Sequence, residues 1–315
     1  MKKLALLLGT LTLVSGAAYA KEVVPVVEEV AVVEEAPVAA PALRVTSVGQ
    51  GIEIDNTSGG SNIGESVFFK NYANLAYGDN WEFNLMASKI WDMDTDDGIH
   101  SKDHRIELGF WRHFDNVSLG FKWRGQEDFD RYYLRTKYNY GMFGGWIDFA
   151  YQSNNGATDK EDAYYVEAIP VQLTVGPLTM GYYFEADTWA VNDKEDGFEH
   201  FYRQQLRLSA PIYQGEKLKV GLEYRWQFDT SNEYDETRRQ AWLDNGGIGV
   251  NGWTEANSNT HIVVLSAAYN VTDNFVIDGY YQYDMKDYDA KGPDKVNEDD
   301  DKYYGEFYIG WTYLF

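Results

Sequence analysis

Hydrophobic and polar residues alternate one by one along most of the chain after Arg44. In the segment 117–124, the apolar positions are Val117, Leu119, Phe121 and Trp123. The segments 218–227 and 275–284 alternate in the same way. A period of two residues is typical of a β-strand with one apolar and one polar face. Each run is about ten residues long, the length that a tilted strand needs to cross a bilayer.

Fourteen segments show this pattern, which predicts an all-β protein with about 14 antiparallel strands; 12 or 16 strands are the alternatives. The segments begin near residues 45, 65, 81, 104, 117, 131, 145, 163, 178, 199, 218, 261, 275 and 302. The first segment is the weakest, because residues 46–51 barely alternate. Without it the count would be odd, which single-chain bacterial barrels avoid.

The links between these segments alternate between short and long. The short links are the turn-forming sequences Gly78–Asn80, Phe114–Asn116, Phe143–Gly144, Gly176–Pro177, Gln214–Lys217 and Thr272–Asn274. The long links are acidic and cover residues 92–102, 153–162, 190–198, 229–260 and 287–301. Short periplasmic turns at one end and long extracellular loops at the other are typical of a transmembrane barrel. We therefore expect a transmembrane antiparallel β-barrel over residues 44–315.

The last segment is strongly aromatic on one face. That face carries Phe307, Ile309, Trp311, Tyr313 and Phe315. An open strand edge of this kind would promote aggregation in water, and pairing with the first strand would remove it. The residues Trp311, Tyr313 and Phe315 also resemble the assembly signal of bacterial outer-membrane proteins, which implies the barrel-assembly machinery as a partner.

The N-terminal residues predict export. Lys2 and Lys3 precede a short apolar run over residues 4–14, and Ala18-Tyr19-Ala20 matches a cleavage site, so residues 1–20 are read as a signal peptide. Residues 21–43 are rich in Val, Glu, Pro and Ala, which favours an extended periplasmic tether. This tether is either a spacer or a docking arm. Export together with a barrel places the protein in the outer membrane of a Gram-negative-type bacterium.

Composition narrows the function. The chain has 27 basic and 50 acidic residues, and its net charge of −23 argues against nucleic acid as a partner. It contains no cysteine, which excludes disulfides, thiol catalysis and iron–sulfur clusters. The chain has 25 tyrosines and 10 tryptophans. These side chains combine an apolar ring with a polar group and suit the interface between a membrane and water.

If the apolar faces contact lipid, the polar faces line the barrel interior. The predicted interior basic residues are Arg105, Lys122, Arg124, Arg135, Lys137, Arg203, Arg207 and Arg225. The predicted interior acidic residues are Glu107, Asp148, Glu185, Asp187, Glu223, Asp278, Asp284 and Glu306. A basic wall facing an acidic one would set up a field across a pore. Two interpretations stay open: a basic stripe that guides anions, or charges that pair between neighbouring strands and fill the barrel.

The long links hold further candidates. The link 229–260 is long enough to fold inward as a constriction lined by Arg238, Arg239 and Trp242. The acidic runs Asp92–Gly98 and Glu298–Asp301 suit loose binding of divalent cations, but their spacing does not match a calcium loop, so no metal site is expected.

Catalysis is not expected, and neither is a cofactor. Four histidines, His100, His104, His200 and His261, fall near the predicted extracellular rim, where acidic residues are abundant. A pairing of aspartate with histidine there could activate water, but with so many acidic residues such pairs arise by chance. The chain has no serine-centred nucleophile motif and no HExxH zinc motif.

The opening MKKLALLLGTLTLVSGAAYAKEV, the Val/Glu/Pro tether and the acidic, Tyr-rich barrel that ends in Phe resemble the major outer-membrane porins of fusobacteria. Strands such as Gly221–Arg225 are also loosely similar to oligogalacturonate-type porins. The resemblance implies passive diffusion of small hydrophilic solutes or ions, with lipid and lipopolysaccharide as surroundings and a homotrimer as one assembly. The alternative is a surface adhesin or structural barrel with a blocked interior.

Overall fold

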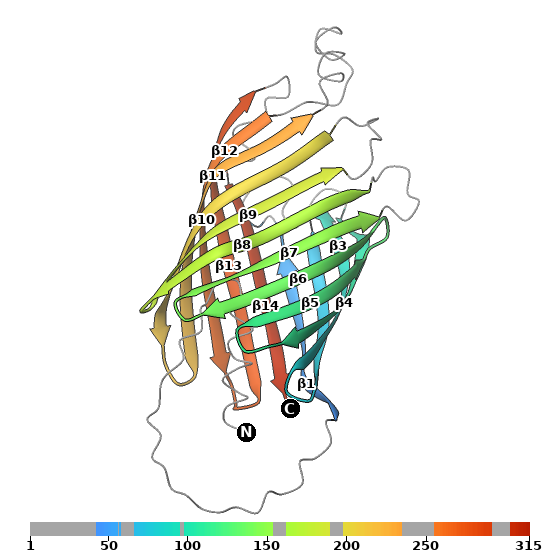
Figure 1. Ribbon diagram of the computed structural model, residues 1–315. Helices are drawn as coiled ribbons and strands as arrows, with labels where there is room; N and C mark the ends of the chain where they lie inside the picture. The colour runs from blue at the N-terminus through green and yellow to red at the C-terminus, as the bar shows by residue number, and fades with distance from the viewer. Residues whose placement is uncertain are drawn as a thin grey trace, which may run out of the picture.

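The computed structural model describes residues 42–55, 57, 66–94, 98–153, 162–189, 198–234, 255–291 and 303–315. Fourteen antiparallel strands close into one barrel, in which each strand pairs with its sequence neighbours and β14 pairs with β1 (Figure 1). The predicted fold and the count of 14 strands are confirmed. The described residues contain no helix that is long and apolar enough to cross a membrane.

The strands are tilted against the barrel axis (Figure 1). Their bounds are β1 (Leu43–Ile54), β2 (Val67–Tyr77), β3 (Trp81–Asp94), β4 (Gly98–His113), β5 (Val117–Gly125), β6 (Asp130–Tyr140), β7 (Phe143–Ser153), β8 (Ala163–Val175), β9 (Leu178–Trp189), β10 (Phe198–Gln214), β11 (Leu218–Tyr234), β12 (Glu255–Asn270), β13 (Phe275–Lys291) and β14 (Tyr303–Leu314). The barrel therefore begins one residue earlier than predicted. The predicted signal peptide (1–20) and nearly all of the predicted tether (21–43) lie outside the described residues.

The short turns lie at the end of the barrel that also carries the C-terminus (Figure 1). Gly78, Gly141 and Gly176 have positive φ angles of 58°, 66° and 58° in three of these turns, a conformation that costs glycine little. The predicted turn at Phe143–Gly144 is wrong, because β7 begins at Phe143 and the turn residues are Gly141 and Met142. The register of β6 and β7 fixes this position, since Tyr140 pairs with Phe143.

At the opposite end, strands continue into segments that were predicted to be loops. β3 ends at Asp94 and β4 begins at Gly98, inside the predicted link 92–102. β11, β12 and β13 likewise extend into the predicted links 229–260 and 287–301. Most of these stretches do not alternate between apolar and polar residues, but the backbone hydrogen bonds of a strand do not depend on side-chain polarity. The short link 126–129 between β5 and β6 also lies at this end.

The seam between β1 and β14 explains why the first strand barely alternates. β1 pairs with β14 from Ser47–Leu314 to Ile54–Phe307. Gly49 and Gly51 leave the interior face of β1 bare, and the rings of Tyr72 and Tyr308 lie over them: a Cβ at Gly49 would be 2.3 Å from Tyr72 Cζ. Tyr72 reaches across β1 and donates a hydrogen bond to the carbonyl of Trp311 at 3.0 Å. Tyrosines from the neighbouring strands thus replace the missing β1 side chains.

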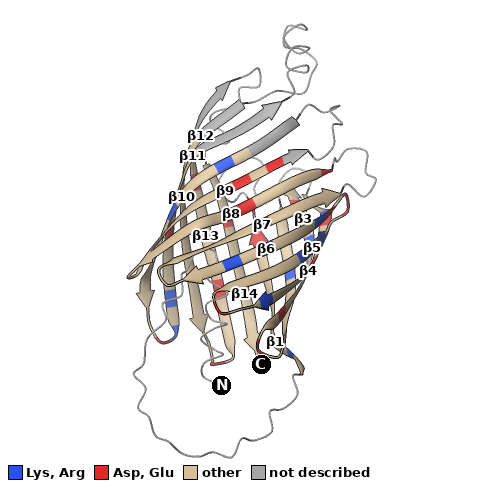
Figure 2. Cartoon of the chain, viewed as in Figure 1, with Lys and Arg blue, Asp and Glu red and all other residues tan. Residues whose placement is uncertain are grey.

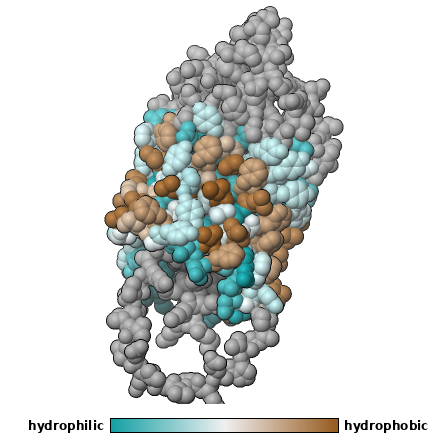
Figure 3. Space-filling view, in the orientation of Figure 1, coloured by the Kyte–Doolittle hydropathy of each residue, from teal (hydrophilic) through white to brown (hydrophobic). Residues whose placement is uncertain are grey.

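The outer face of the barrel is apolar. Exposed side chains there include Leu85, Leu108, Leu134, Phe149, Leu206, Leu222, Leu265, Ile277 and Ile309. Hydrophobic residues gather around the middle of the face seen in Figure 3, with hydrophilic residues below them. Near the short turns, Arg112 stacks on Trp81 at 5.0 Å, and Tyr313 packs against Phe315 with ring centroids 5.1 Å apart. Trp311 stacks on Phe275 at 5.8 Å, so the predicted assembly residues Trp311, Tyr313 and Phe315 border this end.

Candidate functional site in the barrel interior

The interior face of the barrel is charged. Residues directly opposite each other in an antiparallel pair point to the same face. The register links one such row from β6 to β10: Arg135, Asp148, Glu167, Glu185 and Arg203. By the same reasoning, all the predicted interior residues lie on this face: Arg105, Lys122, Arg124, Arg135, Lys137, Arg203, Arg207, Arg225, Glu107, Asp148, Glu185, Asp187, Glu223, Asp278, Asp284 and Glu306.

Further charged residues of this face were not predicted. One is Glu82 on β3, which is opposite Trp111 and lies 3.4 Å from Nε2 of His113. Arg131 shares the parity of Arg135 on β6 and was detectable from that alternation. Glu167 was hidden because the register of β8 and β9 shifts after Ala168, which breaks the period of two. Glu53 was missed because β1 is too weakly patterned to define its faces. It forms an ion pair with Lys70 of β2, which was also not predicted: Lys70 Nζ lies 2.6 Å from Glu53 Oε2.

Many of these charges pair with a neighbour. Arg124 Nε lies 2.6 Å and Lys122 Nζ 3.8 Å from the Glu107 carboxylate. Arg135 Nε lies 2.8 Å from Asp148 Oδ2, and Arg203 Nε lies 3.4 Å from Glu185 Oε2. These pairs join adjacent strands, whereas Arg225 pairs with Glu223 on its own strand. The arrangement favours the second interpretation of the sequence, in which interior charges are balanced locally.

We use the name charged band for eight of these side chains. From β4 to β11 its members are Glu107, Arg124, Arg131, Glu167, Glu185, Arg207, Glu223 and Arg225. In chain order they are one acid, two bases, two acids, one base, one acid and one base. Figure 2 shows basic segments in blue and acidic segments in red on successive strands of the wall. The charged band has no net charge.

Two tyrosines hold the centre of the charged band. Glu167 and Glu185 are directly opposite each other on β8 and β9, an arrangement that repulsion destabilises. Tyr165 donates to Glu167 at 3.0 Å, and Tyr183 donates to Glu185 at 2.8 Å. The guanidinium of Arg131 lies 4.5 Å from the centroid of the Tyr165 ring, and that of Arg207 lies 3.6 Å from the Tyr183 ring. Hydroxyl donors and flanking cations therefore offset the repulsion.

A second acidic cluster lies across the barrel. The Tyr280 hydroxyl lies between the carboxylates of Glu53, at 2.9 Å, and Glu306, and it can donate its single proton to either of them. β1 and β8 are seven positions apart in the ring of fourteen strands, so the two clusters occupy opposite sides. Going around the wall, a basic sector on β4 to β6 is followed by an acidic one on β8 and β9, a basic one on β10 and β11, and an acidic one on β13, β14 and β1. The sequence led us to expect one basic and one acidic wall, but the structure has four sectors of alternating charge.

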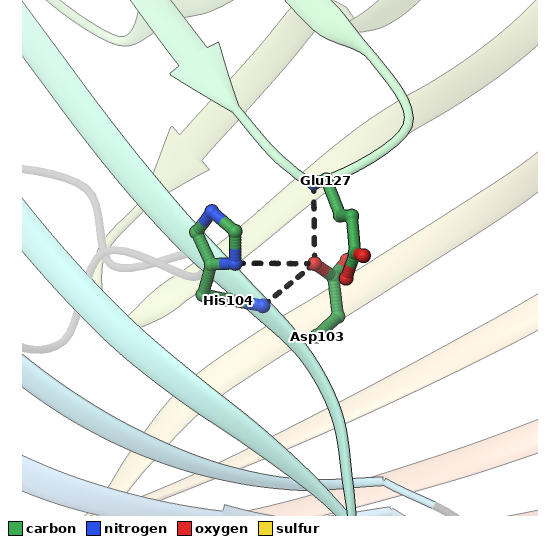
Figure 4. A group of neighbouring side chains, drawn as sticks. All are labelled: Asp103, His104 and Glu127. Carbon is green, nitrogen blue, oxygen red and sulfur yellow. Dashed lines mark hydrogen bonds and ion pairs between the residues drawn. The ribbon is translucent and has the colours of Figure 1, made fainter. Parts of the chain in front are cut away.

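Asp103 and His104, on the extension of β4 beyond its last pair with β5, form a separate group with Glu127 of the link between β5 and β6 (Figure 4). Their ligand atoms lie within 4.8 Å of one another. However, Asp103 Oδ1 accepts the backbone N–H groups of His104 at 2.6 Å and Glu127 at 3.2 Å, and Oδ2 accepts from Gln126 Nε2 at 2.8 Å. The carboxylate therefore fixes the link between β5 and β6. His104 Nδ1 is 3.9 Å from Asp103 Oδ1.

The hydrogen bonds that Asp103 accepts predict how the stability of the link between β5 and β6 changes with pH. Partial burial raises the pKa of Asp103, but hydrogen bonds from Gln126 and the two backbone amides outweigh it and hold the pKa below its ordinary value. The contact therefore contributes stability above the ordinary carboxyl pKa and loses it only as the pH falls through the lowered value. We expect the corrected hydrogen exchange of the Glu127 amide to stay constant from about pH 7 to 5. In Asp103→Ala it should be about tenfold faster at neutral pH; an unchanged rate would contradict this role.

Several predicted candidates lie elsewhere. The constriction residues Arg238, Arg239 and Trp242 and the acidic run Glu298–Asp301 lie outside the described residues, as do residues 95–97 of the other acidic run. His261 is on the outer face of β12, where its Nδ1 lies 2.6 Å from the Tyr224 hydroxyl. His100 lies on the β4 extension, and His200 on β10.

No family model and no curated protein matches the chain. It is similar to solved structures of outer-membrane proteins. OmpT of Vibrio cholerae is 11% identical, with 90% of this chain and 100% of that chain covered and a TM-score of 0.42. OccD3 of Pseudomonas aeruginosa is 14% identical (81% and 70% covered, TM-score 0.43), and the channel DcaP of Acinetobacter baumannii is 10% identical (88% and 98% covered, TM-score 0.40). All three TM-scores are below 0.5, so the description of the fold rests on the strand order and register of this chain.

Proposed function

We propose that the chain is an outer-membrane pore for the passive diffusion of small hydrophilic solutes and ions. The observation that carries this proposal is the reversed polarity of the barrel: its outer face is apolar and its inner face carries charged side chains, many of them in ion pairs. In a water-soluble barrel the apolar side chains would fill the interior. A closed barrel leaves no unpaired strand edge, so its backbone is fully satisfied in lipid.

The strand count supports an open interior. Eight strands leave an interior that side chains fill, whereas larger barrels enclose aqueous channels. Many interior charges are paired, and the band has no net charge, which supports weak selectivity between cations and anions. The polarity of the outer face supports lipid and lipopolysaccharide as surroundings. We further propose that the barrel-assembly machinery inserts the chain into the membrane and that three chains form a homotrimer.

Planar-bilayer recording tests the pore. Refolded full-length chain should give discrete conductance steps, and in a tenfold KCl gradient the reversal potential should stay close to zero, because the paired interior charges leave little net field. A heat-denatured sample is the control. If correctly folded barrels insert without any conductance steps, the pore is refuted and a surface adhesin or structural barrel becomes the better account.

A further inference from the structure

The charged band contains two pairs of arginines that face each other directly. Arg124 on β5 is opposite Arg131 on β6, and Arg225 on β11 is opposite Arg207 on β10. Like charges in directly opposed positions destabilise a sheet unless something compensates them. In each pair one member has a carboxylate partner: Arg124 binds Glu107 at 2.6 Å, and Arg225 binds Glu223.

The other member of each pair is held differently. Within the described part of the chain, neither Arg131 nor Arg207 forms an ion pair with a carboxylate. Arg131 donates to Gln152 and Arg207 donates to Gln205 at 2.9 Å, and both stack on tyrosine rings. Carboxylates also attract both guanidiniums at longer range: Asp187 attracts Arg131, and Glu223 and, more weakly, Glu167 attract Arg207. Each pair therefore has two guanidinium groups and one bound carboxylate.

The geometry of these side chains suits an oxyanion. A guanidinium presents five N–H donors in a fixed fork that matches the oxygens of carboxylate or phosphate. Arg124 and Arg207 donate from Nε alone, whereas Arg131 donates from all three nitrogens to Gln152 and Tyr133, and Arg225 donates from Nε and Nη1. Each Nη carries two N–H groups, so every one of the four guanidiniums keeps at least two donors for a ligand. The tyrosine rings and glutamines hold Arg131 and Arg207 in place before a ligand arrives, which lowers the cost of binding.

We propose that the pairs Arg124–Arg131 and Arg207–Arg225 are two oxyanion-binding stations, each of which takes one carboxylate or phosphate group between its guanidiniums. Their place in a conducting pore rests on the proposed function. Glu167 and Glu185 lie between the stations and repel anions, so the stations bind separately. Anionic solutes would then cross by short stops at defined positions, and their flux would saturate, whereas neutral solutes of equal size would not show saturation.

Binding can be measured without conduction. Full-length chain refolded in detergent is dialysed to equilibrium against radiolabelled citrate or inorganic phosphate at low ionic strength. We expect about two bound anions per chain at saturation, about one in Arg131→Gln or Arg207→Gln, and none in the double variant. Citrate binding without phosphate binding would assign the stations to carboxylates, and the reverse to phosphates; binding of both supports a general oxyanion site.

Lys70→Gln is the matched control, because it removes an interior cation of β2 that already pairs with Glu53. It should keep both bound anions. The inference is overturned if the wild type binds neither anion, if the double variant binds as the wild type does, or if Lys70→Gln loses binding equally. Gel mobility before and after heating shows whether each variant is folded. Binding without bilayer conductance would refute the pore and keep the stations, whereas conductance without binding would do the opposite.

Discussion

Replacing Gly49 with alanine is expected to prevent stable closure of the barrel. The new Cβ would lie 2.3 Å from Cζ of Tyr72 and 2.4 Å from the carbonyl oxygen of Trp311. The second contact is with backbone, which cannot rotate away, and both atoms belong to the strands that flank β1. Overpacking of a tight site costs about 1–3 kcal/mol, and this position should reach the upper end because it lies at the seam between the first and last strands.

The fraction of chain that folds into detergent micelles or liposomes measures this effect, together with the urea midpoint of unfolding. Gly109→Ala is the control, because Gly109 also lies on the inner face of a strand but its Cβ would find only ordinary contacts at 3.6 Å or more. We expect Gly109→Ala to fold as the wild type does. If Gly49→Ala folds equally well, the tyrosine-covered seam is not what closes the barrel.

Replacing Arg135 with methionine should strongly destabilise the barrel. Asp148 is only 5% exposed, and its Oδ2 accepts from Arg135 Nε at 2.8 Å. Removing one partner of a buried pair costs about 3–5 kcal/mol, because the remaining charge is left without compensation. The Arg135 side chain is 21% exposed, so we expect a loss of about 3 kcal/mol in the free energy of unfolding.

The partner variant separates charge from packing. Adding Asp148→Asn to Arg135→Met should restore stability to within about 1 kcal/mol of the wild type, because no uncompensated charge remains. Arg203→Met provides the comparison: Arg203 lies 3.4 Å from Glu185 with a side chain that is 39% exposed, so its loss should cost about 1 kcal/mol or less. Equal losses for Arg135→Met and Arg203→Met would show that burial of the pair is unimportant.

The sequence alone determined the class of fold, the number of strands and the two faces of most strands. Each strand of the barrel has an apolar outer face and a polar inner face, so its sequence alternates with a period of two residues. Fourteen segments of the sequence show this alternation. The interior position of residues such as Arg124 and Asp148 followed from the same alternation. It failed locally at β1 and at the register shift of β8, where Glu53 and Glu167 were missed.

Only the tertiary structure decided which charges meet. The order of charge in the band depends on the register between strands, and a shift of the register changes every partner without changing the pattern along any single strand. The closure of β1 on β14 was equally hidden, because the side chains that cover Gly49 and Gly51 come from Tyr72 and Tyr308 on other strands. The outer ends of the strands were hidden because most of their sequences do not alternate between apolar and polar residues, although their backbones pair as strands. The alternation of residues along a strand therefore shows which face contacts lipid and which face is polar. The contacts between side chains of different strands are fixed only when the strands pair and the barrel closes.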